Sequence, residues 1–308
     1  MTFYGSVSGA WALLTFRVCG RIAGAVRAAK TIPKTTELEE LARLALDGNR
    51  EALESLIGAL QADVFGIALR MLGNQEDAED ATQEILIRIV TRLSQFDFRS
   101  KLKTWAYRIA VNYVLDLQRS PAQRQKRSFH ELAEAIVAGI SQESPSETER
   151  SLLVEEVKVA CTLGMLQCLD RPLRAAYILG EIMELGGPQA AEILEISPSL
   201  FRKRLEKARS EMMMFLRGYC GLVSDAAPCK CNRQVPVALR AGLVHQNGCR
   251  FSVTETSFEE IRAKVRRVEE ARWAFQVHHT SRMPGSSVDF ARRMLAVLDV
   301  HFDQSNRS

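Results

Sequence analysis

Several features that mark other classes of protein are scarce in these 308 residues or missing from them. The seven cysteines are an odd number, and the apolar stretch near the start carries Arg17, Arg21 and Arg27 inside it rather than ahead of it, unlike a secretory signal. These features argue against a disulfide framework, and a cytoplasmic protein is expected. No run of about 18 apolar residues lacks a charge, so we expect no membrane-spanning segment and no membrane partner.

An excess of charge of one sign is also missing. The 41 Lys and Arg residues against 37 Asp and Glu residues leave a formal net charge of +4. This balance excludes a histone-like polycation and an acidic tail protein, whereas a local basic patch can still bind nucleic acid. We find no nucleophile–base grouping and no glycine-rich phosphate loop, so the sequence predicts a protein that is not an enzyme.

Apolar residues recur at helical spacing along most of the chain, which predicts an all-α fold without internal repeats. A leader at 1–36, disordered or loosely helical, precedes a helical domain at 37–119. Residues 120–148 are rich in Ser, Pro and Glu, and we expect a flexible linker there because such a segment buries too little apolar surface to become ordered. A second helical domain covers 149–219, and a helical extension covers 220–308.

The first domain contains a predicted helix at 76–93 with two different faces. Asn74 is the candidate N-cap, and acidic residues crowd the first turn, where the helix dipole stabilises them. Apolar residues at helical spacing turn the other face toward a core. The acidic face is either a solvated surface or a docking surface for a basic partner.

A basic-aromatic loop at 95–103 leads into a second predicted helix at 104–119. Aromatic and basic side chains together can stack on unpaired bases and hold phosphates, although spacing alone favours Phe96 and Phe98 as core residues. The polar residues of the helix fall on one stripe, at i, i+4, i+8 and i+11: Arg108, Asn112, Asp116 and Arg119.

The second domain contains a short predicted helix at 189–195, a tight turn and a helix that begins with Ser197 as N-cap and Pro198 at the first helical position. This is the helix-turn-helix pattern, whose second helix enters a major groove. Residues 199–209 carry five basic residues and one acidic residue, so their sum of +4 equals the charge of the whole chain. The residues predicted to bind DNA, through guanine edges and phosphates, are Ser199, Arg202, Lys203, Arg204, Lys207 and Arg209.

The two domains, in this order, resemble the extracytoplasmic-function sigma factors, the small two-domain members of the sigma-70 superfamily. The first domain carries Asp77-Ala-Glu-Asp-Ala-Thr-Gln-Glu84 and Thr104-Trp-Ala-Tyr-Arg-Ile-Ala-Val-Asn112. The second carries Leu169-Asp-Arg-Pro-Leu-Arg174 and Ala190-Ala-Glu-Ile-Leu194 ahead of the basic helix. One departure is Leu200-Phe-Arg-Lys203 where many members have a Ser-Val-Lys-Ser run, so contacts to the minus-thirty-five element are expected to differ.

The resemblance implies a sigma-2 domain and a sigma-4 domain that together start transcription at promoters. It implies that the acidic helix docks on the largest subunit of core RNA polymerase through Asp77, Asp80, Gln83, Glu84 and Arg88. It implies that the first domain binds and opens the minus-ten element through Lys101, Lys103, Arg108, Asn112, Asp116 and Arg119. The implied partners are core RNA polymerase, duplex promoter DNA, its melted strand and an anti-sigma factor.

The extension carries a group of candidate metal ligands: Cys220, Cys229, Cys231 and Cys249, with His245 as a fifth. Thiolates suit zinc or copper, although the C-x8-C-x-C-x17-C spacing lacks the two-residue gap of ordinary zinc fingers. The Cys229-Lys-Cys231 pair looks like the C-x-C of metal-responsive tails in some family members. The alternative is a set of reduced thiols without a metal. No cofactor is required for the predicted function, and the extension is also a candidate mask for the sigma-4 domain.

Two other functions compete with this interpretation. A helix-turn-helix transcription regulator with an all-helical sensor domain would share the basic helix but would need neither the acidic helix nor the polar stripe. A metal-binding interaction protein would use its helices only to position the cysteines.

Overall fold

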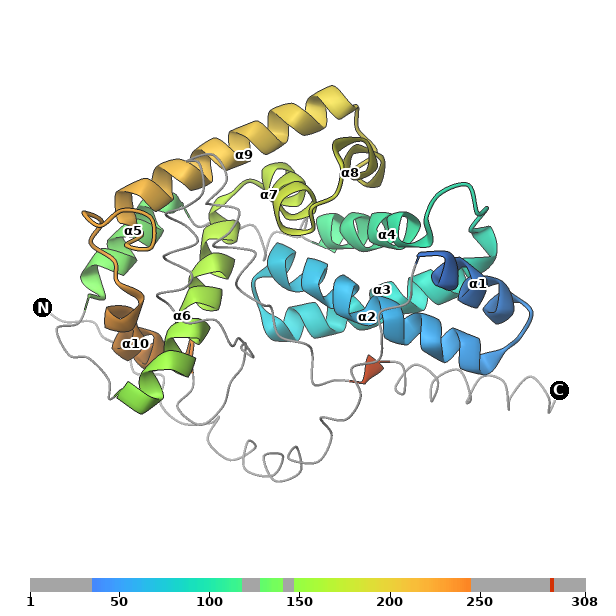
Figure 1. Ribbon diagram of the computed structural model, residues 1–308, viewed down its shortest axis with the longest axis horizontal. Coiled ribbons are helices and arrows are strands. Elements are labelled where there is room, and N and C mark those ends of the chain that lie inside the picture. Colours follow the sequence, from blue (N-terminus) through green and yellow to red (C-terminus); the bar gives the residue numbers. More distant parts are fainter. Residues whose placement is uncertain (1–34, 118–127, 141–146, 245–288, 291–308) are drawn as a thin grey trace, which may run out of the picture. The chain divides into compact units, whose positions relative to one another are not determined.

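The structure is a computed structural model, and it describes residues 35–117, 128–140, 147–244 and 289–290 (Figure 1). Every regular element in these ranges is a helix, and the one β feature there is an isolated parallel bridge between Cys220 and Cys229. The predicted all-α fold is confirmed. Nearly all of the leader, the end of the extension and the helices expected there lie outside the described ranges.

The first domain is a bundle of four helices with one 3-10 turn. In chain order these are α1 (Thr35–Leu46), α2 (Arg50–Leu72), α3 (Gln75–Thr91), η1 (Leu93–Gln95) and α4 (Leu102–Leu117). Helix α2 packs against α1, α3 and α4. Among the described helices, α2 alone is long and apolar enough by composition to cross a membrane, yet 56% of its most apolar window is buried in the bundle, which is typical of a core helix.

The ends of these helices follow the capping residues in the sequence. The side chain of Asn74 accepts a hydrogen bond from the Asp77 amide, so the predicted N-cap of α3 is confirmed. Gly73 ends α2 with a φ of 75°, a left-handed conformation that glycine adopts without steric cost. At the start of α4, the Leu102 amide donates to the Glu39 carboxylate of α1 at 2.8 Å. The two predicted helices of this domain therefore form. Helix α3 lies within two residues of its predicted bounds, and α4 begins two residues before its predicted start.

The second domain contains four α-helices and one π-helical turn. They are α6 (Glu147–Cys168), α7 (Arg171–Tyr177), the π-helical η3 (Ile178–Ile182), α8 (Gly187–Ile193) and α9 (Pro198–Tyr219). Helix α9 packs on α7 and α8. The contact is close at Gly180, where a Cβ atom would lie 2.8 Å from the Leu205 Cδ2 atom. Glycine at this position therefore sets how closely the long helix approaches the π-helical turn.

A helix lies inside the segment expected to be a flexible linker. Helix α5 (Phe129–Ala138) begins with a capping box formed by Ser128 and Glu131, and its Phe129 ring lies 5.1 Å from the ring of Phe215 in α9. The apolar residues Phe129, Leu132, Ala133 and Ile136 recur at helical spacing, so this part of the linker buries a face and becomes ordered. Of the rest of the predicted linker, 120–127 and 141–146 lie outside the described ranges, and residues 147–148 begin α6.

The described part of the extension continues the second domain. After a loop, α10 (Cys231–Arg240) packs against α6, and the Gln234 amide donates to the Ile136 carbonyl of α5 at 2.8 Å. Three elements far apart in the sequence, α5, α6 and α10, therefore lie against one another.

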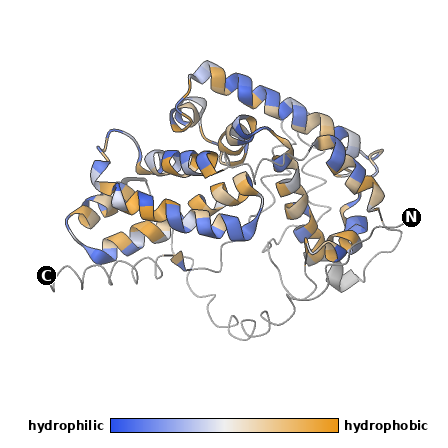
Figure 2. Cartoon of the chain, turned by 180° about the vertical axis from the view of Figure 1, so that it is seen from behind, coloured by the Kyte–Doolittle hydropathy of each residue, from blue (hydrophilic) through white to orange (hydrophobic). Residues whose placement is uncertain are grey.

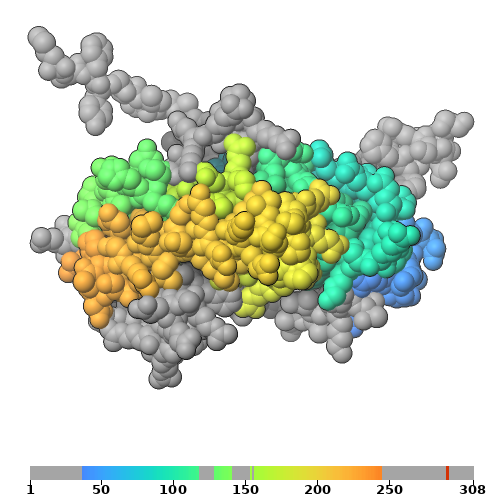
Figure 3. Space-filling model, turned by 90° about the horizontal axis from the view of Figure 1, so that it is seen from above, coloured from blue at the N-terminus to red at the C-terminus, as the bar shows by residue number. Residues whose placement is uncertain are grey.

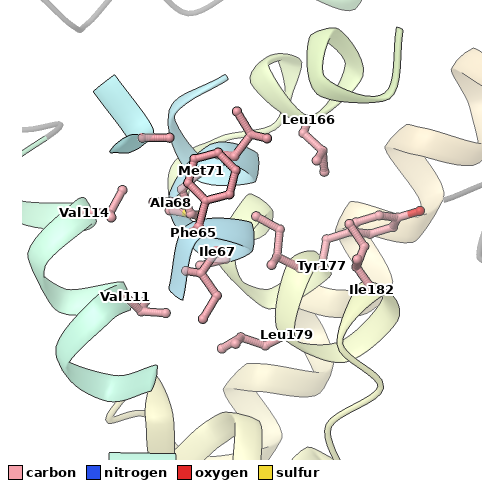
Figure 4. Close-up of a cluster of buried hydrophobic side chains, with 14 of the residues drawn as sticks. Phe65, Ile67, Ala68, Met71, Val111, Val114, Leu166, Tyr177, Leu179 and Ile182 are labelled. Atoms are coloured by element: carbon pink, nitrogen blue, oxygen red, sulfur yellow. The ribbon is translucent and has the colours of Figure 1, made fainter. Parts of the chain in front are cut away.

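Buried apolar side chains from both domains form one cluster. Figure 4 shows Phe65 and Met71 of α2 and Val111 of α4 in the same region as Leu166 of α6 and Tyr177 of α7. In Figure 2, hydrophilic and hydrophobic residues alternate along α9, as expected for an amphipathic helix with one buried side and one exposed side.

Candidate nucleic-acid and polymerase interfaces

The helix-turn-helix motif forms as predicted, from α8, a turn and α9. The Leu200 amide donates to the Ser197 side chain at 3.2 Å, and Pro198 occupies the first turn of α9. In the turn, Glu195 has a φ of 53°, a left-handed conformation that reverses the chain between the helices. Phe201, Leu205, Ala208 and Met212 recur at helical spacing and form the buried stripe of α9.

The N-cap of α9 gives a direct test of this local structure. Replacing Ser197 with alanine removes the acceptor of the Leu200 amide, so we expect the free energy of unfolding to fall by about 1 kcal/mol. Chemical denaturation followed by circular dichroism measures the change. The control variant Ser197→Thr keeps a hydroxyl at the same position and should lose much less. Equal stability of the alanine and threonine variants would show that the cap contributes nothing.

The solvent-facing side of α9 is basic, and we call its residues Ser199, Arg202, Lys203 and Lys207 the recognition face. All four are exposed, and Arg204 is half-buried beside them. Within the described part of the chain, Arg202 and Lys203 form no ion pair, and Lys207 lies 3.9 Å from Glu211. Figure 3 shows α9, in yellow, at the surface of the face turned to the viewer. The recognition face therefore holds side chains able to reach base edges and phosphates.

Arg209, which the sequence also places among the DNA-binding residues, has a structural partner. Its Nε atom donates to the Glu181 carboxylate at 2.6 Å, and Glu181 is buried in the π-helical turn. A buried carboxylate needs a partner of opposite charge, so Arg209 stabilises the packing of α9 on η3. Its predicted contact with DNA stays a prediction.

The aromatic residues before α4 are built into the core. Phe96 is buried, and its ring centroid lies 5.5 Å from that of Trp105 and 4.6 Å from that of Phe98. The Arg43 guanidinium lies over the Phe98 ring at 4.5 Å, a cation–π contact. In this conformation Phe96 therefore serves packing, as its spacing favours. The charged residues of this loop that face solvent are Lys101 and the neighbouring pair of Arg99 and Asp97, which lie 3.5 Å apart.

Lys103 is engaged inside the bundle. Its ammonium lies 2.8 Å from the Asp63 carboxylate, and the same carboxylate oxygen accepts a hydrogen bond from the Tyr107 hydroxyl at 2.5 Å. Burial, followed by the charge of Asp63, raises the pKa of Tyr107, so its hydroxyl stays protonated as a donor. Asp63 and Tyr107 were not among the predicted site residues, because neither belongs to the polar stripe.

The polar stripe of α4 faces the turn of the helix-turn-helix motif. The Asn112 amide donates to the Glu195 carboxylate at 3.2 Å, and the Gln189 amide donates to the Thr104 hydroxyl at 3.0 Å. Arg108 is half-buried and Asp116 is exposed, whereas Arg119 lies outside the described ranges. In this conformation the polar stripe of α4, which is predicted to contact the minus-ten element, therefore lies next to the helix-turn-helix motif.

The acidic helix α3 presents the residues predicted to bind polymerase on one side. Asp77 and Asp80 are exposed, and Gln83, Glu84 and Arg88 are half-buried. Arg88 pairs with Glu84 at 3.0 Å and lies over the Tyr113 ring at 4.5 Å. The exposed negative charge is therefore concentrated at the first turns of the helix, toward Asp77 and Asp80.

One buried arginine joins the two domains, and no periodic pattern in the sequence singles it out. Arg174 is 5% exposed and donates to the backbone carbonyls of Met71, Gln167 and Leu169 and to the Gln167 side chain. Desolvation lowers the pKa of Arg174 to about 10, so it is still charged at neutral pH. Arg174 therefore satisfies carbonyl groups at the end of α2 and at the end of α6.

The structure brings together three of the four predicted metal ligands and adds another cysteine. Cys220, Cys229 and Cys231 line one small cavity together with Cys161 of α6. Cys249 and His245 lie outside the described ranges. Across the described residues, no group of three or more His, Cys, Asp or Glu side chains is arranged to hold a metal ion. The zinc or copper site at these four predicted cysteines therefore stays a prediction.

Comparisons with known proteins agree with this arrangement. The family model described as Sigma-70 region 2 matches residues 56–125, which include most of α2, all of α3 and α4. The chain is 29% identical to the ECF RNA polymerase sigma factor SigW of Bacillus subtilis over 177 residues, 55% of this chain and 91% of that protein. It is 29% identical to the RNA polymerase sigma factor CnrH of Cupriavidus metallidurans over 183 residues, 57% of this chain and 92% of that protein.

A third relative is the RNA polymerase sigma factor NccH of Alcaligenes xylosoxydans xylosoxydans. It is 30% identical over 182 residues, which make up 58% of this chain and 94% of that protein. A regulator that shared only the helix-turn-helix motif would not match along nearly the whole length of these proteins, and its first domain would not match sigma-70 region 2. The chain therefore belongs to the extracytoplasmic-function sigma factors of the sigma-70 superfamily.

Proposed function

We propose that this sigma factor binds core RNA polymerase in the cytoplasm, directs it to promoters through the minus-ten and minus-thirty-five elements, and helps to separate the DNA strands. The observation that carries the proposal is the exposed basic recognition face of α9, presented by a helix-turn-helix motif on the same chain as a sigma-70 region 2 bundle. The role needs no catalytic residue in this chain, because the polymerase forms the phosphodiester bonds. An anti-sigma factor remains a predicted partner.

Strand separation would use binding free energy. Unstacking and unpairing a base costs a few kcal/mol, and pocket contacts and stacking on the protein offset that cost. In the described conformation Phe96 is packed in the core, so the exposed Lys101 and the polar stripe supply the first contacts to the melted strand.

Promoter binding also requires a change in the described conformation. The two promoter elements are named for their positions before the transcription start, so they lie about 25 base pairs apart. At about 3.4 Å per base pair, this separation is roughly 85 Å. Asn112 and Glu195, by contrast, are in hydrogen-bond contact at 3.2 Å. The polar stripe of α4 and the recognition face of α9 cannot reach both elements while that contact holds, so α4 and α8 separate in the proposed complex.

Reconstitution with core polymerase tests the proposal. The purified full-length chain is mixed with sigma-free core polymerase and a library of promoter fragments, and transcript starts are mapped. We expect transcription from a defined set of promoters that core polymerase alone does not use. A chain that forms no complex with core polymerase, or a complex that selects no start site, would overturn the proposal.

The polymerase-docking surface can be tested by reversing one charge. We expect Asp80→Arg in α3 to weaken binding to core polymerase by roughly tenfold, because the exposed carboxylate would face a basic surface. Glu54→Arg is the matched control, since it reverses an exposed acid on α2 of the same bundle. Binding is measured by titrating labelled chain with core polymerase. Equal losses in both variants would mean that the effect reflects net charge and not docking through α3.

A further inference from the structure

The end of α9 and the start of α10 meet at two cysteines. Cys220 follows the last residue of α9 in an extended conformation, and the chain loops through eight residues and returns alongside it at Cys229. The Gly221 amide donates to the Cys229 carbonyl at 2.9 Å, and the Cys229 amide donates to the Tyr219 carbonyl at 3.1 Å. Cys220 and Cys229 are therefore directly paired residues of a parallel β-bridge.

The approach of the two backbones is unusually close at Gly221. A Cβ atom there would lie 2.3 Å from the Cys229 carbonyl oxygen, so no larger residue fits without moving the backbone. The glycine next to Cys220 thus keeps the two cysteine backbones at bridge distance.

This geometry suits a disulfide bond. Neighbouring strands lie about 4.8 Å apart, and paired residues of a bridge direct their side chains to the same side. Disulfides join residues whose Cα atoms are about 4.4–6.8 Å apart. Both thiols line the same small cavity.

The described lining of this cavity shows no metal site. No three of its side chains are arranged as ligands within the described part of the chain, and the rest of its lining includes apolar groups such as Met165 and Phe215. Lys158, which is 4% exposed, also lines the cavity.

We propose that Cys220 and Cys229 form a disulfide bond when the protein is exposed to a peroxide, and that this bond fastens the extension to the end of the recognition helix. In the reaction two S–H bonds are lost and one S–S bond forms. Hydrogen peroxide takes up the two electrons and two protons and leaves as two water molecules. The inference does not depend on the proposed function, since it concerns only these thiols and the helices that they join.

The bond would hold together a set of helices that are otherwise joined by packing and a few hydrogen bonds. Helix α10 packs on α6, and its Gln234 donates to Ile136 of α5. In the reduced chain, two backbone hydrogen bonds keep the end of α9 beside the start of α10. A covalent link there restricts local opening of α10.

Peptide mapping of the full-length chain tests the proposal. The chain is treated with hydrogen peroxide, the remaining thiols are alkylated, and the digest is analysed by mass spectrometry before and after reduction. We expect a linked pair of peptides containing Cys220 and Cys229 that disappears on reduction. Limited proteolysis should cut α10 roughly tenfold more slowly in the oxidised chain than in the reduced chain.

Matched variants guard against misfolding and against pairing with other cysteines. Cys168→Ser changes a buried α6 thiol that does not line the cavity, and it should leave the link intact. Cys231→Ser should also leave it intact, and Cys229→Ser should remove both the link and the protection. A link from Cys220 or Cys229 to any other cysteine would overturn the proposal. So would one zinc or copper ion per chain, retained through dialysis and lost in Cys229→Ser, because these thiols would then be metal ligands.

Discussion

Replacing Arg202 and Lys203 together by glutamate should reduce promoter-dependent transcription by roughly 100-fold. Both side chains are exposed on the recognition face of α9, and neither forms an ion pair among the described residues. Each good contact of an arginine with a base edge contributes about 1–3 kcal/mol, and a glutamate in its place adds repulsion by the phosphates. Transcription by the reconstituted holoenzyme on a mapped promoter measures the loss.

The control for this variant is Met214→Glu. Met214 is 71% exposed on the same helix, and it lies fifteen positions after Ser199, about 22 Å from the start of the recognition face. It adds a negative charge to α9 without touching the face, so transcription should stay near the wild-type level. Binding to core polymerase should be unchanged in both variants. If the double variant still transcribes normally, α9 is not the helix that reads the minus-thirty-five element.

Replacing Arg174 by leucine should lower the free energy of unfolding by about 3 kcal/mol. The guanidinium is buried and donates to three backbone carbonyls and to the Gln167 side chain. Leucine fills part of the volume but leaves these acceptors without donors, and a buried acceptor that has lost its partner costs more than an average hydrogen bond contributes. Denaturant unfolding monitored by circular dichroism gives the change.

The matched control is Arg171→Leu, which removes the same charge from a half-buried position one turn earlier. We expect a loss of about 0.5 kcal/mol or less there, as is usual for partly exposed positions away from such networks. Arg174→Lys should fall between the two, because an ammonium group keeps the charge but can satisfy fewer carbonyls from one place. Indistinguishable unfolding of the Arg174→Leu and Arg171→Leu chains would show that the buried network does not stabilise the fold.

Much of the fold could be predicted from the sequence because its signals are local. Asn74 and Ser197 mark helix starts through their own side chains, and the apolar spacing of α9 separates a buried stripe from an exposed one. The residues predicted on the recognition face are exposed because the same periodicity that buries Phe201 turns Arg202 outward.

The features that sequence reasoning missed depend on contacts between distant segments. Arg174 interacts with Met71, more than a hundred residues earlier, and no periodic pattern reports such a pair. Arg209 and Lys103 look like exposed DNA-binding residues in the sequence, yet each meets a carboxylate, Glu181 and Asp63, on another element. Cys161 lies among apolar neighbours in α6, so its place beside Cys220 follows only from the packing of α6 on the end of α9. Helix α5 was not predicted, because the Ser- and Pro-rich residues on either side of it indicated a flexible linker.

Helix α5 limits how far apart the two helical domains can move. Twenty-nine residues lie between Leu117 and Glu147, and a fully extended chain of that length would span about 100 Å. While α5 stays packed on α6 and α9, only the ten residues between Leu117 and Ser128 connect the two domains, and this connection spans at most about 40 Å. If α5 detached, the maximum length of this connection would more than double. The distance between promoter elements that the two domains of one chain can reach therefore depends on whether Phe129 stays beside Phe215.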